Sequence, residues 1–485
     1  MQAASEKGIW RIITASSVGT LIEWYDFYIF GSLSTIIAAK FFPSENPTAA
    51  LLSTLATFAA GFIVRPFGAL VFGRLGDLIG RKYTFLLTLI LMGISTFLIG
   101  CVPSYATIGS WAPVLVLLLR LIQGLALGGE YGGAATYVAE HSPANRRGFY
   151  TSWIQTTATL GLFLSLGVIL GTRRLVGVEE FTNGNGWRYP FLLSILLVII
   201  SIIIRLRMKE SPLYAKLKER GKTSINPLKE SFGNKLNFKM VLIALFGATM
   251  GQGVIWYTSQ FYAQNFLLTK CNIEYEQANS IILIALVIAT PFFIIFGSLS
   301  DKWGRRNIIL IGMLLGVLLY RPIFERMYTI ADPASKEVLE NTVDPQNAAT
   351  VVTNYADGTV QKVTSKSTGG VVKTTKEVLL SQGEKWKIIS LVVAMVLFVT
   401  MVYGPIAALL VEMFPTRIRY TSMSLPYHIG NGVFGGLVPF IATLITTIPG
   451  TNHLSGLWYP IGVGALCFII GALYLSNKMD ANVED

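Results

Sequence analysis

Long runs of apolar residues, separated by short polar or charged stretches, repeat along the whole chain. Each run has about 20 residues, the length at which a helix crosses the roughly 30 Å hydrocarbon core of a bilayer. Twelve such runs lie near residues 12–38, 51–73, 83–102, 112–138, 149–171, 187–206, 238–266, 278–298, 308–328, 387–411, 421–446 and 457–476. The pattern predicts an all-α membrane protein with twelve transmembrane helices, numbered here as spans 1 to 12.

Two short motifs occur once in each half of the chain. The sequence G-R-L-G-D-L-I-G-R-K at Gly73–Lys82 returns as G-S-L-S-D-K-W-G-R-R at Gly297–Arg306. A Glu140–Arg147 segment returns in the same way as Glu412–Arg419. Two recurring landmarks indicate a duplicated chain, and we expect two pseudo-symmetric six-helix bundles. The expected organisation is an N-terminal six-helix domain (1–207), a cytoplasmic linker (208–237) and a C-terminal six-helix domain (238–485).

A polar insertion at about 329–386 makes the second half longer than the first. It separates spans 9 and 10, so the topology places it on the extracytoplasmic side. Within it, the β-prone runs Thr350–Thr353 and Thr359–Val363 flank Asp357-Gly358. Two such runs around Asp-Gly are typical of a hairpin. We expect either a small ordered flap or a flexible loop, with a role in substrate capture as one hypothesis.

The distribution of charge defines the two sides of the protein. Only 14% of residues are charged, too few to cover a soluble protein of 485 residues, and the net charge is +12. Basic residues gather in the loops after spans 2, 4, 6, 8 and 10, and the positive-inside rule therefore places these loops and both termini in the cytoplasm. We expect a multi-pass protein of the cytoplasmic (inner) membrane, in contact with lipid and not with nucleic acid. The three cysteines form no metal or disulfide pattern, and we expect no metal and no cofactor.

Span 1 carries two acids, Glu23 and Asp26, at a spacing that places them on one helix face. Charges inside a membrane cost roughly 2.5–3.5 kcal/mol each on translocon scales, so a chain that keeps them usually pairs or uses them. Partial desolvation favours the protonated carboxyl group, which suits a residue that gains and loses a proton. We expect proton coupling here, with Asp26 as the main candidate. The alternative is a pair of helix-end charges facing headgroups or an arginine.

Three further charged residues lie at membrane depth in the first half. Arg120 in span 4 is always charged and can hold a carboxylate through two hydrogen bonds. It could pair with a span 1 acid or bind an anionic substrate. Glu130 lies about 15 Å further along the same helix, and we expect it in the inner half of the pathway. Arg65, just before Pro66 in span 2, could bind a substrate carboxylate or neutralise Glu130 or Asp26.

Glycines recur in span 5 at Gly161, Gly167 and Gly171. Small residues let membrane helices approach closely. We therefore expect all three positions to pack against neighbouring helices.

The motifs together resemble the major facilitator superfamily, and within it the metabolite:proton symporter family. The resemblance rests on Glu23–Phe27, Arg65–Gly68, Gly73–Lys82, Arg120–Gly124 with Gly128–Gly132, Glu140–Gly148 and Glu210-Ser211-Pro212. It covers nearly the whole chain apart from the insertion. Transporters of α-ketoglutarate, citrate, shikimate, proline and betaine share these features, so the resemblance selects no substrate.

This resemblance implies roles for further residues. In the superfamily, spans 1, 4, 7 and 10 line the pathway. The expected substrate contacts are Arg65, Tyr25, Arg120, Gln123, Gln252, Trp256 and Tyr403. The expected proton-coupling residues are Asp26, Glu23, Arg120 and Glu130. The loop motifs imply a conformational latch in each half, formed by Asp77, Arg81 and Glu140 and by Asp301, Arg305 and Glu412.

The leading hypothesis is a proton-coupled symporter that imports a small organic acid or a zwitterionic metabolite by alternating access to a central site. A uniporter or exchanger of the same fold is the main alternative. A transporter-like receptor would need a soluble signalling domain, and none is visible. An enzyme would need a nucleophile or a catalytic cluster with suitable spacing, and the sequence has none. We therefore expect a transporter, not an enzyme, that works as a monomer.

Overall fold

The computed structural model describes residues 6–43, 46–79, 81–129, 135, 138–139, 142–206, 229, 232–344, 347–368, 371–414 and 419–477. Most of the predicted linker at 208–237 lies outside these residues. The same is true of Glu130 and Glu140. The statements below concern the described part of the chain.

The first half consists of long helices joined by short connections. These are α1 (Glu6–Ser32) with α2 (Ser34–Phe41), α3 (Pro47–Ile63) with α4 (Arg65–Ile79), α5 (Arg81–Cys101), α7 (Trp111–Gly128), α9 (Arg147–Val176) and α11 (Tyr189–Leu206), with the short α6 (Tyr105–Ile108) and α10 (Val178–Thr182) at loops. Span 2 is broken between α3 and α4 because Pro66 lacks an amide hydrogen and cannot continue the helical hydrogen bonds. The break places Arg65 at the joint.

The second half repeats this plan with more interrupted helices. Span 7 comprises α14 (Lys235–Ala244), α15 (Met250–Tyr257) and α16 (Ala263–Thr269), joined by π-helical turns at Leu245–Thr249 and Thr258–Tyr262. The remaining elements are α17 (Tyr275–Ala289), α18 (Pro291–Trp303), α19 (Arg305–Ala331), α20 (Gln382–Tyr403), α21 (Ile406–Met413), α22 (Arg419–Tyr427), a π-helical stretch at His428–Gly435, α23 (Val438–Ile445) and α24 (Trp458–Tyr474). Such π-helical turns are rare and frequently mark functional positions.

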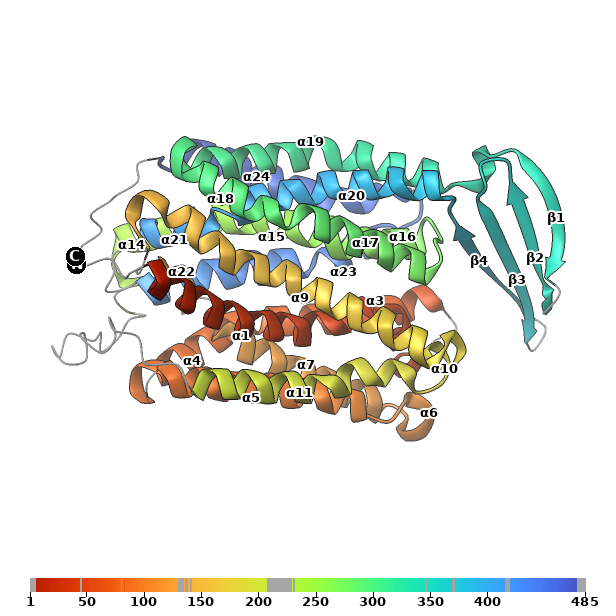
Figure 1. The fold of residues 1–485 in the computed structure, drawn as a ribbon, viewed down its shortest axis with the longest axis horizontal. Coiled ribbons are helices and arrows are strands. Elements are labelled where there is room, and N and C mark those ends of the chain that lie inside the picture. The colour runs from red at the N-terminus through yellow and green to blue at the C-terminus, as the bar shows by residue number, and fades with distance from the viewer. Residues whose placement is uncertain are drawn as a thin grey trace.

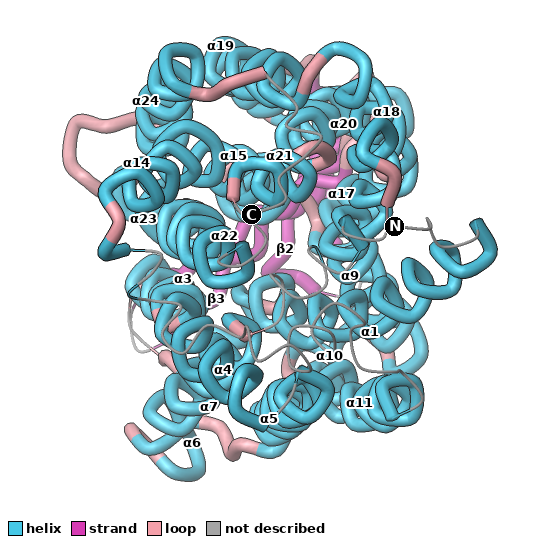
Figure 2. Tube along the Cα trace, turned by 90° about the vertical axis from the view of Figure 1, so that its left-hand side faces the viewer, coloured by secondary structure: helices cyan, strands magenta, loops and turns pink. Residues whose placement is uncertain are grey.

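Ten of the described segments are long and apolar enough to cross a membrane, and they correspond to spans 2 and 4 to 12. Span 3 is α5, whose apolar part covers Leu86–Cys101. Span 1 is formed by α1 and α2. The fold is therefore an all-α membrane protein, consistent with the predicted twelve spans. The helices run along the long axis in two groups that meet at the centre (Figures 1 and 2).

The two ends of this bundle differ. We call the end where α1 begins and α24 finishes the terminal end, and the opposite end the sheet end (Figure 1). At the sheet end the insertion forms four antiparallel strands in the order β1-β2-β3-β4: β1 (Val338–Asp344), β2 (Asn347–Tyr355), β3 (Val360–Thr368) and β4 (Val371–Leu379). Seen from the terminal end, the strands lie behind the centre, where the two groups of helices meet (Figure 2).

The predicted hairpin around Asp357-Gly358 is confirmed, because β2 and β3 pair across this turn. Gly358 has a φ of 80°, a conformation that side chains disfavour and glycine adopts readily. The sequence prediction was incomplete, however, because it identified only the central strands. The flanking strands β1 and β4 extend the hairpin into an ordered flap.

Close helix crossings bring the polar residues of the core together. A methyl group at Gly124 of α7 would overlap the carbonyl of Gly61 in α3, and one at Gly128 would overlap the carbonyl of Arg65. These crossings press span 2 against span 4. In span 5 the packing prediction is confirmed for Gly161, which lies against Trp24. It is wrong for Gly167 and Gly171, because a Cβ at either position would meet no atom within 4 Å.

Candidate functional site

Two buried arginines flank the ring of Phe27 in α1. The guanidinium carbon of Arg65 lies 4.6 Å from the ring centroid and that of Arg120 lies 4.1 Å from it. Both side chains are completely buried. Aromatic faces attract cations, which explains how a membrane core tolerates two positive charges so near each other. Arg65 also faces the second half, where a Cβ at Gly432 would lie 3.5 Å from its Cδ.

The two arginines differ in how well their hydrogen-bonding groups are satisfied. Arg120 donates from Nη1 to Oε1 of Gln123 at 2.6 Å and to the carbonyl of Phe27 at 3.3 Å, and from Nη2 to the carbonyl of Phe58 at 3.4 Å. For Arg65, neither Nε nor Nη2 has a hydrogen-bond partner among the described residues. Buried donors without partners are costly. Arg65 is therefore the better placed of the two to receive a carboxylate.

Asp26 precedes Phe27 in α1 and is completely buried. Neither of its carboxylate oxygens has a hydrogen-bond partner within the described residues. Its main-chain carbonyl accepts a hydrogen bond from Nε2 of Gln123 at 3.3 Å, so Gln123 connects the Asp26 backbone to Arg120. Glu23, one turn earlier, is also buried. The structure thus brings Arg65, Arg120 and Gln123 together around the segment of α1 that carries Glu23 and Asp26.

Tyr25 points elsewhere. Its hydroxyl donates to the carbonyl of Pro190 at 2.7 Å, which lies in α11 of the same half. In this conformation its hydroxyl joins helices of the first half and does not face the second.

The second half presents a chain of uncharged polar groups. Nε2 of Gln252 donates to Oδ1 of Asn431 at 3.2 Å, and Nδ2 of Asn431 donates to the hydroxyl of Tyr427 at 3.3 Å. The hydroxyls of Tyr427 and Tyr403 lie 2.7 Å apart. This network links spans 7, 10 and 11. It includes Gln252 and Tyr403, two of the three substrate contacts predicted in the second half. His428 lies beside Tyr427 and is buried with neither ring nitrogen hydrogen bonded among the described residues.

Aromatic rings join the halves between these two polar regions. Trp24 stacks on Tyr28 with centroids 4.9 Å apart, and Tyr28 stacks on Trp256 at 5.2 Å. Phe62 of span 2 contacts Tyr257 of span 7 at 5.0 Å. Sequence reasoning identified Trp256 but missed Tyr28, because aromatic residues inside spans are too common to stand out.

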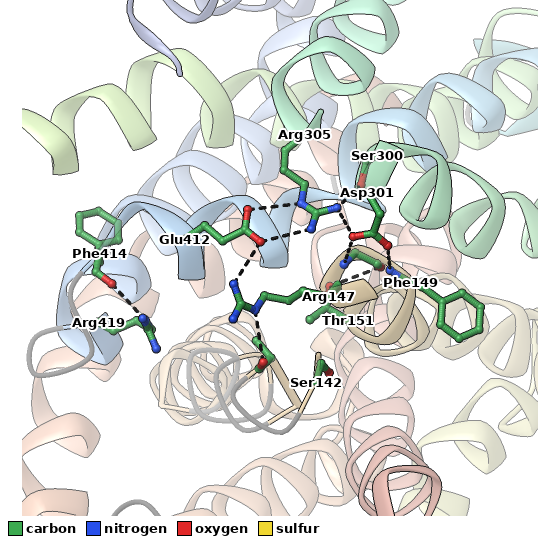
Figure 3. A network of polar contacts seen from close by, with 12 residues as sticks. Ser142, Arg147, Phe149, Thr151, Ser300, Asp301, Arg305, Glu412, Phe414 and Arg419 are labelled. Carbon is green, nitrogen blue, oxygen red and sulfur yellow. Dashed lines mark hydrogen bonds and ion pairs between the residues drawn. The ribbon is translucent and has the colours of Figure 1, made fainter. Parts of the chain in front are cut away.

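A charged cluster closes the terminal end (Figure 3). Arg305 contacts Asp301 at 2.5 Å and Glu412 at 3.2 Å. Arg147 of the first half contacts the same Glu412 oxygen at 3.2 Å. The main-chain amides of Gly148 and Phe149, at the start of α9, each donate to Asp301 at 2.9 Å. We call this group the terminal-end cluster.

The terminal-end cluster joins the two halves, which the sequence motifs did not indicate. Asp301, Arg305 and Glu412 are brought together as the resemblance implied, but Arg147 and the start of α9 complete the group. The corresponding motif of the first half cannot be compared. The side chains of Asp77 and Arg81, and all of Glu140, lie outside the described residues.

A second charged group joins the halves at the sheet end. Arg173, near the end of α9, contacts Glu274 at 3.1 Å and Glu276 at 3.7 Å. Arg174 pairs with Glu276. The carboxylate of Glu274 also accepts the amides of Glu276 and Gln277 at the start of α17. We call this the sheet-end cluster. Sequence reasoning missed it because charges at span ends are ordinary.

Comparison with solved structures identifies the fold. The crystal structure of a D-xylose–proton symporter matches with a TM-score of 0.67 and 17% identity, covering 98% of this chain and 99% of that one. A partially occluded, inward-open structure of the xylose transporter XylE from E. coli gives 0.65 at 20% identity, covering 97% and 98%. The fold is that of a major facilitator superfamily transporter.

Sequence relatives narrow this class. The alpha-ketoglutarate permease of Escherichia coli (strain K12) is 31% identical, over 98% of this chain and 95% of that protein. The proline/betaine transporter of Salmonella typhimurium is 30% identical, over 97% and 84%. The profile of the "Sugar (and other) transporter" family matches residues 12–239. The chain belongs to the metabolite:proton symporter family of the major facilitator superfamily, and it is a multi-pass membrane transporter and not an enzyme.

Proposed function

We propose that the chain is a proton-coupled symporter that imports a small organic acid or a zwitterionic metabolite. The observation that carries this proposal is the completely buried carboxylate of Asp26, which has no hydrogen-bond partner among the described residues. It lies in α1, the helix that both buried arginines contact through Phe27. A buried carboxylate without a cationic partner is more stable when protonated. Asp26 would take up a proton at one side of the membrane and release it at the other.

The substrate would lie between the halves. Arg65, with two unused donors, would hold its carboxylate, and the Gln252–Asn431–Tyr427–Tyr403 network would contact its remaining polar groups. The Trp24–Tyr28–Trp256 stack would have to separate to admit it. Arg120 would keep Phe27 and Gln123, and hence Asp26, in position.

The two charged clusters would govern access. Opening at either end requires α9 to separate from span 8, so the terminal-end cluster would break in one open state and the sheet-end cluster in the other. Alternating access needs states of similar free energy, and clusters of a few contacts suit that requirement. By the positive-inside rule the terminal end would face the cytoplasm, in the inner membrane, and the sheet would lie outside.

The test is uptake into proteoliposomes under an imposed inward proton gradient, with α-ketoglutarate, citrate, shikimate, proline and betaine as probes. Symport predicts accumulation of at least one compound above its external concentration, and an uncoupler should abolish that accumulation. Equilibration or counterflow that an uncoupler leaves unchanged would instead establish a uniporter or exchanger.

A further inference from the structure

A cavity of about 390 Å³ lies between the sheet and the helix ends beneath it. Thr35 at the start of α2, Leu268 of α16, and Asn272, Ile273 and Tyr275 at the start of span 8 line it from the helix side. Strands β2, β3 and β4 line it from the other side. Its walls thus come from both halves of the transporter, and its volume falls in the range of about 300–1,000 Å³ common for small-molecule sites.

The sheet presents a polar face to this cavity. Thr350, Thr364 and Thr375 lie directly opposite one another on three neighbouring strands, so their side chains share one face. The hydroxyls of Thr350 and Thr364 are 2.8 Å apart. Two positions along the same face, Lys362 of β3 lies opposite Glu377 of β4. All five residues line the cavity.

The cavity carries charges of both signs. Lys362 contributes an ammonium group, and Asp344 and Glu377 contribute two carboxylates. Lys376 lies between Thr375 and Glu377 on β4, so its side chain points to the other face of the sheet. Partial burial raises the pKa of Glu377 above its usual value, and Glu274 raises it further, while Lys362 and Arg173 act in the opposite direction. A dicarboxylate would be attracted by Lys362 and repelled by the two acids. A zwitterion can satisfy both signs at once.

Main-chain bonds fix the cavity walls in place. The amide of Glu274 donates to the carbonyl of Val378 at 2.9 Å, and the amide of Val378 donates to the carbonyl of Asn272 at 2.7 Å. The side chain of Gln277 both donates to the carbonyl of Leu380 and accepts its amide, at 2.9 and 2.8 Å. A wall held in this way loses little freedom when a ligand binds. The same bonds join β4 to the segment that carries the sheet-end cluster.

We propose that this cavity is a second binding site, an antechamber, which holds a small zwitterion with one carboxylate and one cationic nitrogen before it enters the central pathway. The Lys362 ammonium group binds the carboxylate, the threonine hydroxyls contribute hydrogen bonds, and Glu377 and Asp344 face the cationic nitrogen. The proposal rests on the proposed transport function and narrows its substrate class to zwitterions.

The test measures equilibrium binding of radiolabelled glycine betaine, proline and α-ketoglutarate to the purified full-length protein, together with uptake into proteoliposomes. The test variant is Lys362→Gln, and this position is exposed. Lys387→Gln is the matched control, because Lys387 lies at the same end of the molecule, is exposed, and is not among the lining residues.

Loss of charged hydrogen bonds predicts about a tenfold rise in the apparent KM for the zwitterions, with the maximal rate kept and binding weakened similarly. The control should change neither quantity. Glu377→Gln should weaken betaine binding and leave α-ketoglutarate binding equal or stronger.

Several outcomes would overturn the antechamber. These are an unchanged KM in Lys362→Gln, an equal effect of Lys387→Gln, and no binding of either zwitterion to the unaltered protein. Failure of the transport proposal looks different. In that case the lysine variant would still weaken zwitterion binding, but no probe would accumulate under a proton gradient.

Discussion

At the scale of single residues, the protein separates two buried arginines by role. Arg120 is held by Gln123, two carbonyls and three aromatic rings, whereas Arg65 keeps unused donors toward the second half. Asp26 completes the group as an acid without a hydrogen-bonded partner in the described structure. In the proposed mechanism, proton handling and substrate handling would fall to different side chains.

Neutralising Asp26 should uncouple the transporter. Asp26→Asn keeps the shape of the side chain but cannot carry a proton. We expect gradient-driven accumulation to be lost while counterflow of the same substrate continues. Uptake and counterflow in the same vesicles test this, with Glu340→Gln on the exposed strand β1 as control. Unchanged accumulation in Asp26→Asn would show that another group carries the proton.

Replacing each arginine by lysine should show which one binds the substrate and which one supports the packing of the helices. Lysine keeps the charge and loses the planar fork that holds a carboxylate. Arg65→Lys should raise KM about tenfold with a nearly unchanged melting temperature. Arg120→Lys should mainly lower the melting temperature, because its fixed contacts to Gln123 and Phe27 are lost. Substrate titration and thermal unfolding of both variants distinguish these effects, and the reverse pattern would reverse the assignment.

Sequence alone could identify Asp26, Arg65 and Arg120 because a charge inside a membrane span is costly and therefore conspicuous. It could not identify Arg173 or Glu274, because span ends tolerate charge and only the fold brings α9 and α17 together. Tyr28 was missed for a related reason. A ring in an apolar span carries no signal until its stacking partner is known.

At the scale of elements, the start of α9 has a second role in the terminal-end cluster. Its first amides have no partners within the helix, and Asp301 accepts two of them. The same carboxylate pairs with Arg305, whose side chain is only 2% exposed. One acid thus joins three elements and both halves.

Asp301→Asn should favour opening at the terminal end. Breaking a buried ion pair typically costs about 3–5 kcal/mol, and asparagine recovers part of this by hydrogen bonding. We expect a cysteine at Thr151, which is buried beside the cluster, to react about tenfold faster with a maleimide in this background. The exposed native Cys101 would first be replaced. Lys302→Gln next to the cluster is the control, and equal reaction rates in both would contradict a latch.

The β2–β3 hairpin should loosen in acid. Partial burial acts to raise the pKa of Asp357, but hydrogen bonds from Lys336 and Thr359 outweigh it and lower the pKa below its usual 3.8. The stabilisation is therefore present above pH 3.8 and is lost as pH falls through the lowered value. It should amount to about 1 kcal/mol or less. At pH values under 3.8, the main-chain amides of β2 and β3 should therefore exchange faster. Asp357→Asn should remove this pH dependence, whereas Glu340→Gln should keep it.

The hairpin also shows why the sequence prediction included β2 and β3 but not β1 and β4. Asp357-Gly358 is a strong local turn signal, and it correctly predicted β2 and β3. Gly-Gly is a turn signal of the same kind, and Gly369-Gly370 stands between β3 and β4 in the sequence, but the prediction did not use it. Strand β4 is also fixed by its bridge to Ile273, far away in sequence. Pairing over that distance follows from the fold and not from local pattern.

At the scale of the whole molecule, α9 contacts span 8 at both ends, but the two contacts differ in how exposed their charged side chains are. In the terminal-end cluster every charged side chain is at most 17% exposed. At the sheet end Arg173 is 7% exposed, but Glu274, Glu276 and Arg174 are 20%, 31% and 71% exposed. Mobile ions screen exposed charges much more than buried ones. The two clusters should therefore respond unequally to salt.

Raising the ionic strength should open the sheet end selectively. From about 0.1 M to 1 M salt the screening length falls from roughly 10 Å to 3 Å. A cysteine at Ser32, which is buried below the sheet-end cluster and receives a hydrogen bond from Tyr275, should then react several-fold faster. A cysteine at Thr151 should change little. Equal acceleration at both sites would indicate a general loosening of the protein and would contradict the unequal response of the two clusters to salt.

The unequal burial of the two clusters determines at which end the empty transporter is mostly open. Separating the exposed sheet-end pairs costs less free energy than separating the buried terminal-end pairs, so the unloaded protein should spend most of its time with the sheet end open. The return of the empty carrier would then be the downhill half of each cycle, and inward delivery would be the half that solute and proton must drive.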